Sequence, residues 1–222
     1  MRKRIIALIS FLCYIVCWTQ AADEHYYFKN LSIKDGLSQT TVNAIMQDKK
    51  GFMWFGTKGG LSRYDGMSFR NFKRDMNDNH SLGNNFVTCL YEDNKGNIWV
   101  GTDAGMYIYY SDREIFVPFN LLSRENTKID RTVSAISGDK EGRVWIAVET
   151  QGLFCYEPQK EQLHNYTLNS FSANVQSVTS DNSGTIWVGF YGSGLFYSKD
   201  NLKTLHPYLS PKDGEEVFKD DA

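Results

Sequence analysis

Four segments of the chain repeat the same spacing of aspartate, glycine and tryptophan, and this repeat limits the possible folds more than any other feature. In each segment a glycine follows the aspartate by three positions and a tryptophan follows it by six. Successive tryptophans lie 45, 46 and 42 residues apart. A period of this size indicates a tandem array of supersecondary units. The aspartate and tryptophan pairs are Asp48 and Trp54, Asp93 and Trp99, Asp139 and Trp145, and Asp181 and Trp187.

Each repeat is expected to form a four-stranded antiparallel sheet. In the second repeat, residues 87–92 are apolar and β-branched, and Asp93 to Gly96 have the composition of a turn. Further strands are predicted over 97–102, 106–110 and 114–119. Four strands in one such period is the size of a β-propeller blade. The fold class is therefore predicted to be all-β, with four stacked blades whose repeated tryptophans are structural. Closure at four blades and assembly with another copy remain open.

The first 21 residues are typical of a secretory signal peptide. A basic head at 2–4 precedes an apolar run over 5–16, and Thr19 and Ala21 are small residues at a suitable cleavage site. The apolar run is too short for a stable membrane span. We therefore expect secretion and no membrane span after cleavage. The alternatives are an uncleaved anchor and a lipid attached to a signal cysteine.

Charge and cysteine content exclude some partners. The formal net charge is −2, so no basic stripe is available to neutralise nucleic-acid phosphates. After signal cleavage only Cys89 and Cys155 remain, each within an apolar strand pattern of a different repeat. Two cysteines make no disulfide framework, and we interpret them as small buried hydrophobic residues.

At the repeats the chain resembles the two-component regulator propeller family. The family pattern is Asp-x-x-Gly-x-hydrophobic-Trp-hydrophobic-Gly-Thr-x-x-Gly-Leu-x-x-Tyr, and the first two repeats match it closely. The third and fourth repeats replace Gly-Thr with Ala147-Val148 and Gly189-Phe190, and they add one residue before the next glycine. The segment 31–38 is similar to the usual start of the family's first blade. The resemblance covers about residues 26 to 210.

The resemblance implies the N-terminal part of a periplasmic sensor region from a Bacteroides-type hybrid two-component sensor histidine kinase. Such sensors carry two seven-bladed propellers, an immunoglobulin-like domain, a membrane helix, a kinase, a receiver and a DNA-binding domain. Their usual ligands are oligosaccharides, and they dimerise through parts outside this sequence. Full-length members are anchored in the inner membrane. The resemblance therefore implies a ligand-sensing segment without a kinase module in this sequence.

The repeat and the resemblance together give the expected domain organisation. A signal peptide over 1–21 precedes a partial propeller over 22–222, which is expected to be an incomplete seven-bladed ring. A strand over 27–33 would pair with the final blade to close the ring. The fifth blade is expected to be truncated. The blades are placed at about 39–82, 83–128, 129–171 and 172–210.

A ligand site is predicted at one axial end of the blades. Loops entering the innermost strand and loops joining the second and third strands meet there, and their residues vary between repeats. Variable amides, charges and aromatics on a constant frame suit the recognition of sugar hydroxyls and ring faces. The predicted ligand-binding residues are Lys58, Asn84, Asn85, Asp103, Arg131, Glu149, Asn174 and Tyr191.

Catalytic signals are poor, and we predict no enzyme, no cofactor and no metal site. The histidines are scattered without metal-ligand spacing, and the repeated aspartates fit turn capping. The leading hypothesis is an oligosaccharide sensor segment. The alternatives are a protein-interaction scaffold, a non-functional fragment, and a propeller lyase or hydrolase that would use Asp103, Asp130 and Glu149.

Overall fold

The computed structural model describes residues 28–121, 128–166 and 174–208. The chain divides into two units, of which the second begins at Leu31 and contains all the strands. The predicted signal peptide over 1–21 and the predicted start of a fifth blade lie outside the described residues. The predicted blade boundaries remain predictions.

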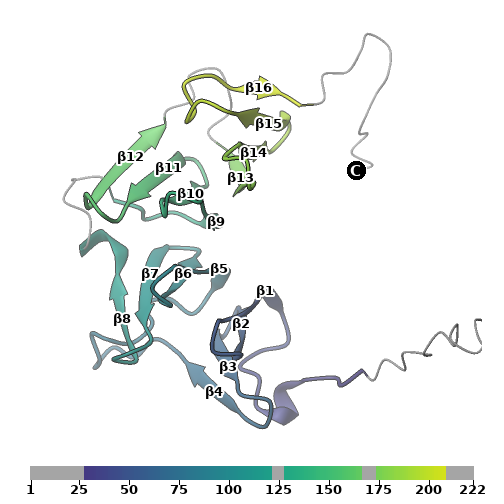
Figure 1. Ribbon diagram of the computed structural model, residues 1–222. Coiled ribbons are helices and arrows are strands. Elements are labelled where there is room, and N and C mark those ends of the chain that lie inside the picture. The colour runs from purple at the N-terminus through teal and green to yellow at the C-terminus, as the bar shows by residue number, and fades with distance from the viewer. Residues whose placement is uncertain (1–27, 122–127, 167–173, 209–222) are drawn as a thin grey trace, which may run out of the picture. The chain divides into compact units, whose positions relative to one another are not determined.

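Sixteen strands in the described residues form four antiparallel sheets, each built from four consecutive strands (Figure 1). The first sheet contains β1 (Val42–Gln47), β2 (Met53–Thr57), β3 (Gly60–Tyr64) and β4 (Phe69–Phe72). The second contains β5 (Val87–Glu92), β6 (Ile98–Thr102), β7 (Gly105–Tyr110) and β8 (Ile115–Pro118). The third contains β9 (Val133–Gly138), β10 (Val144–Val148), β11 (Gly152–Glu157) and β12 (Gln162–Tyr166). The fourth contains β13 (Val175–Ser180), β14 (Ile186–Phe190), β15 (Gly194–Ser198) and β16 (His206–Pro207).

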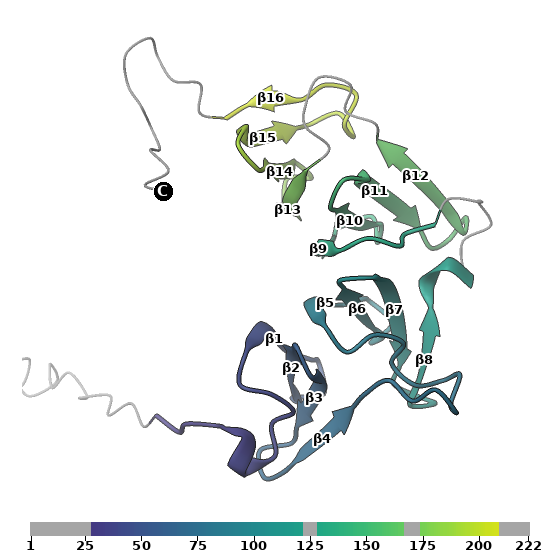
Figure 2. The ribbon, with the colours of Figure 1, turned by 180° about the vertical axis from the view of Figure 1, so that it is seen from behind.

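This topology confirms the all-β prediction of four four-stranded blades. The strands of the second blade begin and end within one residue of the predicted positions. The last of them ends at Pro118 because a short 3-10 helix, η2 (Phe119–Leu121), begins at the next residue. Within the second unit the innermost strands β1, β5, β9 and β13 are neighbours in chain order. The four sheets do not close into a ring, and an opening separates the first from the fourth (Figure 2).

The predicted strand over 27–33 is wrong for the described part of that segment. Residues 28–32 form no strand, and η1 (Ile33–Asp35) is a 3-10 helix. Its local chemistry explains the difference, because Ser32 and Asp35 form a capping box and Gly36 ends the turn with a φ of 107°. The residues after η1 contact the first blade, where the Asn71 side chain donates to the Gly36 carbonyl over 2.8 Å and the Ser38 backbone N–H donates to Ser62 Oγ over 3.1 Å.

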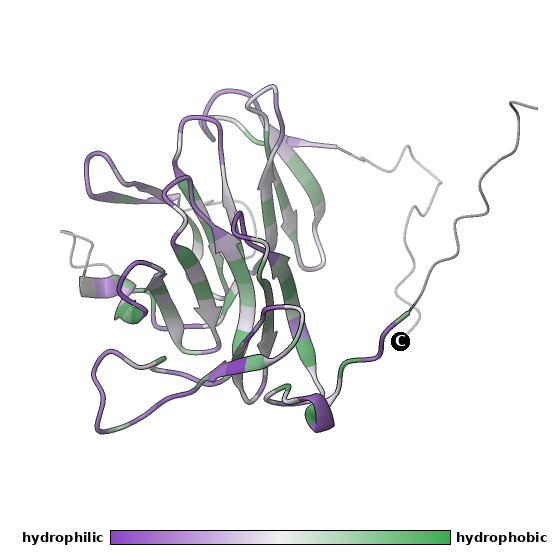
Figure 3. Cartoon of the chain, turned by 60° about the horizontal axis from the view of Figure 1, so that its bottom comes forward, coloured by the Kyte–Doolittle hydropathy of each residue, from purple (hydrophilic) through white to green (hydrophobic). Residues whose placement is uncertain are grey.

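The hydrophobic core lies between consecutive blades and consists of three clusters. Each tryptophan of the first three blades is buried and faces the next blade along the chain. Trp54 packs against Tyr109 of the second blade with ring centroids 5.3 Å apart. Apolar residues follow the strands, whereas polar residues gather in the connecting loops (Figure 3). Stacking therefore buries the sheet faces that a single blade would leave exposed.

Candidate ligand-binding site

One repeated backbone hydrogen bond brings the two predicted sets of loops together. In every blade the residue that follows the second strand donates its N–H to the carbonyl of the residue before the first strand. Both loop sets therefore lie at one end of the blade, as the strand order predicts. The pairs are Lys58 to Thr41 at 3.4 Å, Asp103 to Phe86 at 3.1 Å, Glu149 to Thr132 at 2.9 Å and Tyr191 to Asn174 at 3.0 Å.

The hairpins between the second and third strands differ between the first two blades and the last two, both in length and in their hydrogen bonds. In the first blade Thr57 Oγ1 donates to the Gly60 carbonyl at 2.8 Å and accepts the Gly59 N–H at 3.0 Å. Thr102 does the same in the second blade, with a 2.7 Å bond to the Gly105 carbonyl. The third and fourth blades have no threonine at this position, and their hairpins are one residue longer. The loop end is therefore more tightly tied in the first two blades.

Three predicted residues, Lys58, Asn84 and Asn85, lie in the loops where the first two blades meet, and each contacts a neighbouring residue of these loops. The ammonium group of Lys58 lies 5.3 Å from the centroid of the Phe86 ring across the blade boundary. Asn84 Oδ1 accepts the Phe86 N–H at 2.8 Å, and Asn85 Oδ1 accepts the Arg74 N–H at 2.7 Å. Both amide groups therefore keep their NH₂ ends for other partners while their oxygens shape the loop.

Asp103 and Arg131 lie on neighbouring loops of the second and third blades. The Gly105 N–H donates to the Arg131 carbonyl at 3.1 Å, and Thr132 Oγ1 donates to the Asp103 carbonyl at 3.5 Å. Both side chains are exposed, and the Arg131 guanidinium lies 3.9 Å from the carboxylate of Asp130. The structure thus joins these two predicted residues through backbone contacts and leaves their charges facing solvent.

The remaining predicted residues belong to the third and fourth blades. Glu149 is half-buried in its hairpin. Asn174 Oδ1 accepts a hydrogen bond from Gln176 Nε2 at 3.3 Å. Tyr191 has 68% of its surface exposed. Tyr191 is the one aromatic residue of the predicted set, and its ring is open to a ligand.

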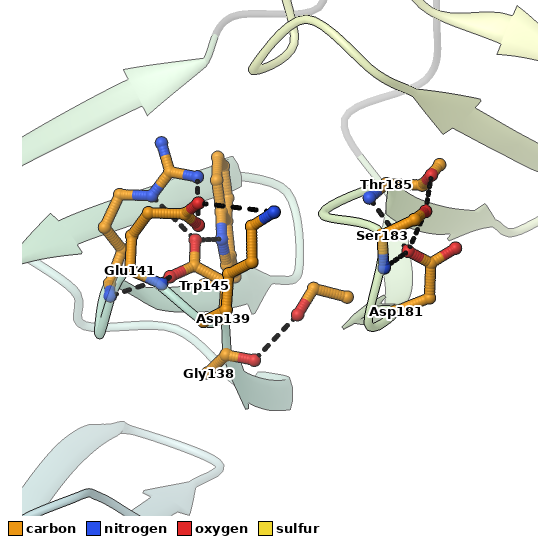
Figure 4. A network of polar contacts seen from close by, with 10 residues as sticks. Gly138, Asp139, Glu141, Trp145, Asp181, Ser183 and Thr185 are labelled. Carbon is orange, nitrogen blue, oxygen red and sulfur yellow. Dashed lines mark hydrogen bonds and ion pairs between the residues drawn. The ribbon is translucent and has the colours of Figure 1, made fainter.

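The opposite end of the blades carries four copies of one aspartate cap. In each copy Oδ1 accepts the backbone N–H groups two and four residues later, and Oδ2 accepts the indole N–H of the tryptophan. In the third blade Asp139 Oδ2 lies 2.8 Å from Trp145 Nε1, with Glu141 and Gly138 beside it (Figure 4). The other indole bonds are Trp54 to Asp48 at 2.8 Å, Trp99 to Asp93 at 3.1 Å and Trp187 to Asp181 at 3.0 Å.

This geometry confirms that the repeated aspartates cap turns. Ser183 Oγ and the Trp187 indole donate to Asp181, and these bonds hold the pKa of its carboxyl well below the usual range (Figure 4). In the described ranges no three side chains of the His, Cys, Asp or Glu type are grouped to hold a metal ion. Nor does any helix there have the length and apolar character that crossing a membrane requires.

Both cysteines are unbridged, and Cys155 is buried as predicted, whereas Cys89 is only partly buried. Cys89 belongs to the core between the second and third blades, and Cys155 belongs to the core between the third and fourth. Burial raises the pKa of both thiols to about 12. Both groups therefore remain protonated at neutral pH and are poor nucleophiles.

A polar contact between neighbouring inner strands was not foreseen from the sequence. Each of the four inner strands has a bulge after its first valine. In the first three blades, the side chain that follows this valine donates to the carbonyl of the next blade's valine. The sequence signal is a polar residue directly after each valine. The bonds run from Asn43 to Val87 at 2.8 Å, from Thr88 to Val133 at 2.5 Å and from Ser134 to Val175 at 2.7 Å.

Comparison with solved structures places this arrangement among β-propellers. An extracellular domain described as part of the BT3049 hybrid two component system from B. thetaiotaomicron matches with a TM-score of 0.73 and 23% identity. The match covers 85% of this chain and 27% of that domain. Virginiamycin B lyase from Staphylococcus aureus matches with a TM-score of 0.61 and 12% identity, over 86% of this chain and 62% of the lyase. The stacked four-stranded sheets are thus blades of a β-propeller.

Sequence comparison adds a family model and a related protein to the structural matches. The family model described as two component regulator propeller matches residues 36–59 and 81–104. A protein named Histidine kinase P4 from Formosa agariphila is 36% identical over 77 residues, which are 35% of this chain and 5% of that protein. The chain is therefore similar to two-component regulator propellers at residues 36–59 and 81–104, and it spans 5% of the length of the histidine kinase and 27% of the BT3049 domain.

Proposed function

We propose that this chain is a ligand-sensing propeller segment of a two-component signalling system and that it acts outside the cytoplasm. Two kinds of similarity support this proposal. The family model belongs to two-component regulators, and the BT3049 structure is an extracellular domain of such a system. The N-terminal sequence pattern supports export to the periplasm.

We further propose that an oligosaccharide binds at the loop end. The observation that carries this proposal is the repeated bond between entry loop and hairpin, which holds variable side chains at one end of a constant frame. Asp103, Arg131 and Lys58 present charged groups to solvent, and Tyr191 presents an exposed ring. Sugars are recognised by hydrogen-bonding groups combined with aromatic faces. Binding that bridges several blades would favour one relative arrangement of the blades, which is the coupling a sensor needs.

A titration with oligosaccharides tests the proposed site. The mature chain would be titrated by isothermal calorimetry with a panel of plant, algal and host glycans, and a saturable signal is expected for one class. Tyr191→Ala should weaken that binding at least tenfold. Tyr208→Ala provides a matched control, because Tyr208 is also exposed, at 53%, and lies outside the predicted site. A folded protein without heat from any glycan, or equal losses in both variants, would contradict the proposal.

We propose a non-catalytic role in preference to a lyase or hydrolase. The lyase structures share the propeller fold at 16% identity or less, and such a likeness is limited to the fold. A role as a protein-interaction scaffold is the other candidate, and a homodimer of the whole sensor would require such contacts. Release of sugar products that Glu149→Ala abolishes would overturn the non-catalytic proposal.

A further inference from the structure

The stack of four blades ends in two free faces. We call the face of a blade that carries the repeated tryptophan its tryptophan face, and the opposite face its back face. Each of the three core clusters joins the tryptophan face of one blade to the back face of the next. Among the described residues, no blade follows the tryptophan face of the fourth blade, and no blade precedes the back face of the first. An opening separates these two faces (Figure 2).

The tryptophan face of the fourth blade keeps the apolar residues of the inner interfaces, but they are partly exposed. Trp187 is half-buried, whereas the other three repeat tryptophans are buried. The rings of Tyr197 and Tyr208 lie beside it, with centroids 5.5 and 4.9 Å from that of Trp187. Leu195 is 37% exposed. The residues at its position in the other blades are all buried: Leu61, Met106 and Leu153.

The back face of the first blade is exposed at its two innermost strands. Ile45 of β1 is 62% exposed, and Phe55, its partner on β2, is half-buried. The residues after η1 contact Ser62 and Asn71 on the outer strands β3 and β4 and leave Ile45 open. The residues at the position of Phe55 in the other blades are fully buried: Val100, Ile146 and Val188.

These two free faces are the two halves of one kind of interface. Terminal units of an open repeat array need polar outer faces to stay soluble, and both faces here are partly apolar instead. The opening keeps the two faces of one chain apart (Figure 2). Two copies can bury all four faces if the fourth blade of each stacks on the first blade of the other. The resulting eight blades lie within the range of about four to eight that is typical of propellers.

We propose that a second copy of this chain covers both free faces in a head-to-tail dimer, with the tryptophan face of each fourth blade on the back face of the partner's first blade. The contact is weaker than the inner interfaces, because the inner strand of the fourth blade has Ser177 and Thr179 where that of the first blade has Ala44 and Met46. A dissociation constant of about 10–100 µM is expected, so that the chain is a monomer at about 1 µM. The proposal is independent of an oligosaccharide at the loop end.

Sedimentation equilibrium of the mature chain from about 1 to 200 µM tests this proposal. A monomer that converts to a dimer over this range is expected. Quenching of tryptophan fluorescence by iodide should fall over the same range, because Trp187 becomes buried. A monomer at every concentration would overturn the proposal, and shielding of Trp187 in that monomer would show that another segment of the same chain covers the face. Polymers larger than a dimer would also overturn it.

Variants of the two faces test the head-to-tail arrangement. Ile45→Glu and Leu195→Lys should each weaken dimerisation at least about tenfold, since each buries a charge in the contact, and both positions are exposed in the monomer, which should stay folded. Met76→Glu is the matched control, because Met76 is 84% exposed in the loop between β4 and β5, and it should leave dimerisation unchanged.

A mixture of the two variants separates this arrangement from a symmetric contact between two tryptophan faces. One of the two contacts in the mixed dimer has neither substitution, and the other joins opposite charges. The mixture should therefore dimerise about fivefold or more tightly than either variant alone. Wild-type dimerisation by Ile45→Glu, or no recovery in the mixture, would overturn the head-to-tail dimer.

Discussion

Replacement of Asp139 by alanine removes a cap whose bonds are buried between two blades. Asp139 Oδ1 accepts the backbone N–H groups of Glu141 and Arg143, and its Oδ2 accepts from the Trp145 indole and from Arg143 Nε. The Asp139 side chain is fully buried, and that of Arg143 is 17% exposed. The variant would therefore leave an indole N–H and a guanidinium without their acceptor in a largely dry interface.

The cost follows from these groups. Loss of one partner from a buried ion pair costs about 3–5 kcal/mol, and a buried donor without an acceptor costs about 1–3 kcal/mol. Arg143 recovers part of this loss by turning to Glu141, whose carboxylate already lies 3.4 Å from Nη2. We therefore expect a loss of about 3–5 kcal/mol in the free energy of unfolding. With a urea m-value of about 2 kcal/mol/M, the midpoint should fall by about 2 M.

Asp181→Ala is the internal control, because Asp181 makes the same cap in the fourth blade with its side chain exposed. Water can replace the lost acceptor there, so the midpoint should fall much less than in Asp139→Ala. Both variants would be unfolded in urea and followed by tryptophan fluorescence and by far-UV circular dichroism. Equal midpoint shifts in the two variants would refute the argument that burial, and not the bond pattern, sets the value of the cap.

Three further predictions concern charge, thiols and the contact between inner strands. Hydrogen bonds from arginine hold the pKa of Glu114 below its usual range. The contribution of Glu114 to stability is therefore complete above the unfolded pKa of about 4.3 and is lost as the pH falls through the folded pKa. Between pH 5 and 2.5 the unfolding midpoint should decline less in Glu114→Gln than in the wild type. Cys89 and Cys155, with a pKa of about 12, should react with Ellman's reagent at pH 8 only after urea unfolding, and rapid native labelling would contradict these raised pKa values. Ser134→Ala should lower the free energy of unfolding by about 1 kcal/mol because the Val175 carbonyl loses a donor. Gln176→Ala should have little effect, because the Gln176 side chain donates to the nearby Asn174; equal thermal shifts in the two variants would contradict this reasoning.

The sequence predicted the blades because their determinants are local. The aspartate, glycine and tryptophan of each repeat form one turn and one indole bond within seven residues, so their spacing alone is informative. Prediction failed over residues 28–33, where the capping box of Ser32 and Asp35 outweighs the extended pattern. The spacing of Ser32 and Asp35, three positions apart, could have indicated a helical turn there.

The candidate sites were predictable to different degrees. The grouping of entry loops and hairpins follows from strand order alone, and the structure shows the bond that joins them. The ligand for these residues remains a prediction. The contacts of Arg63 with Trp54 and of Arg143 with Trp145 could not be predicted, because the two arginines occupy different positions in the repeat.

The aspartate cap is made wholly from residues of its own blade, and this self-sufficiency has a consequence for how such chains grow. A duplicated repeat brings its own turn and its own indole acceptor, so a new copy needs no compensating change in an older one. Two neighbours must still match their apolar faces, but their polar contact needs only a carbonyl on one inner strand and a side-chain donor on the other, a role that asparagine, threonine and serine all fill. Gene duplication can therefore lengthen the array one unit at a time, while the loops of each unit are left to diverge.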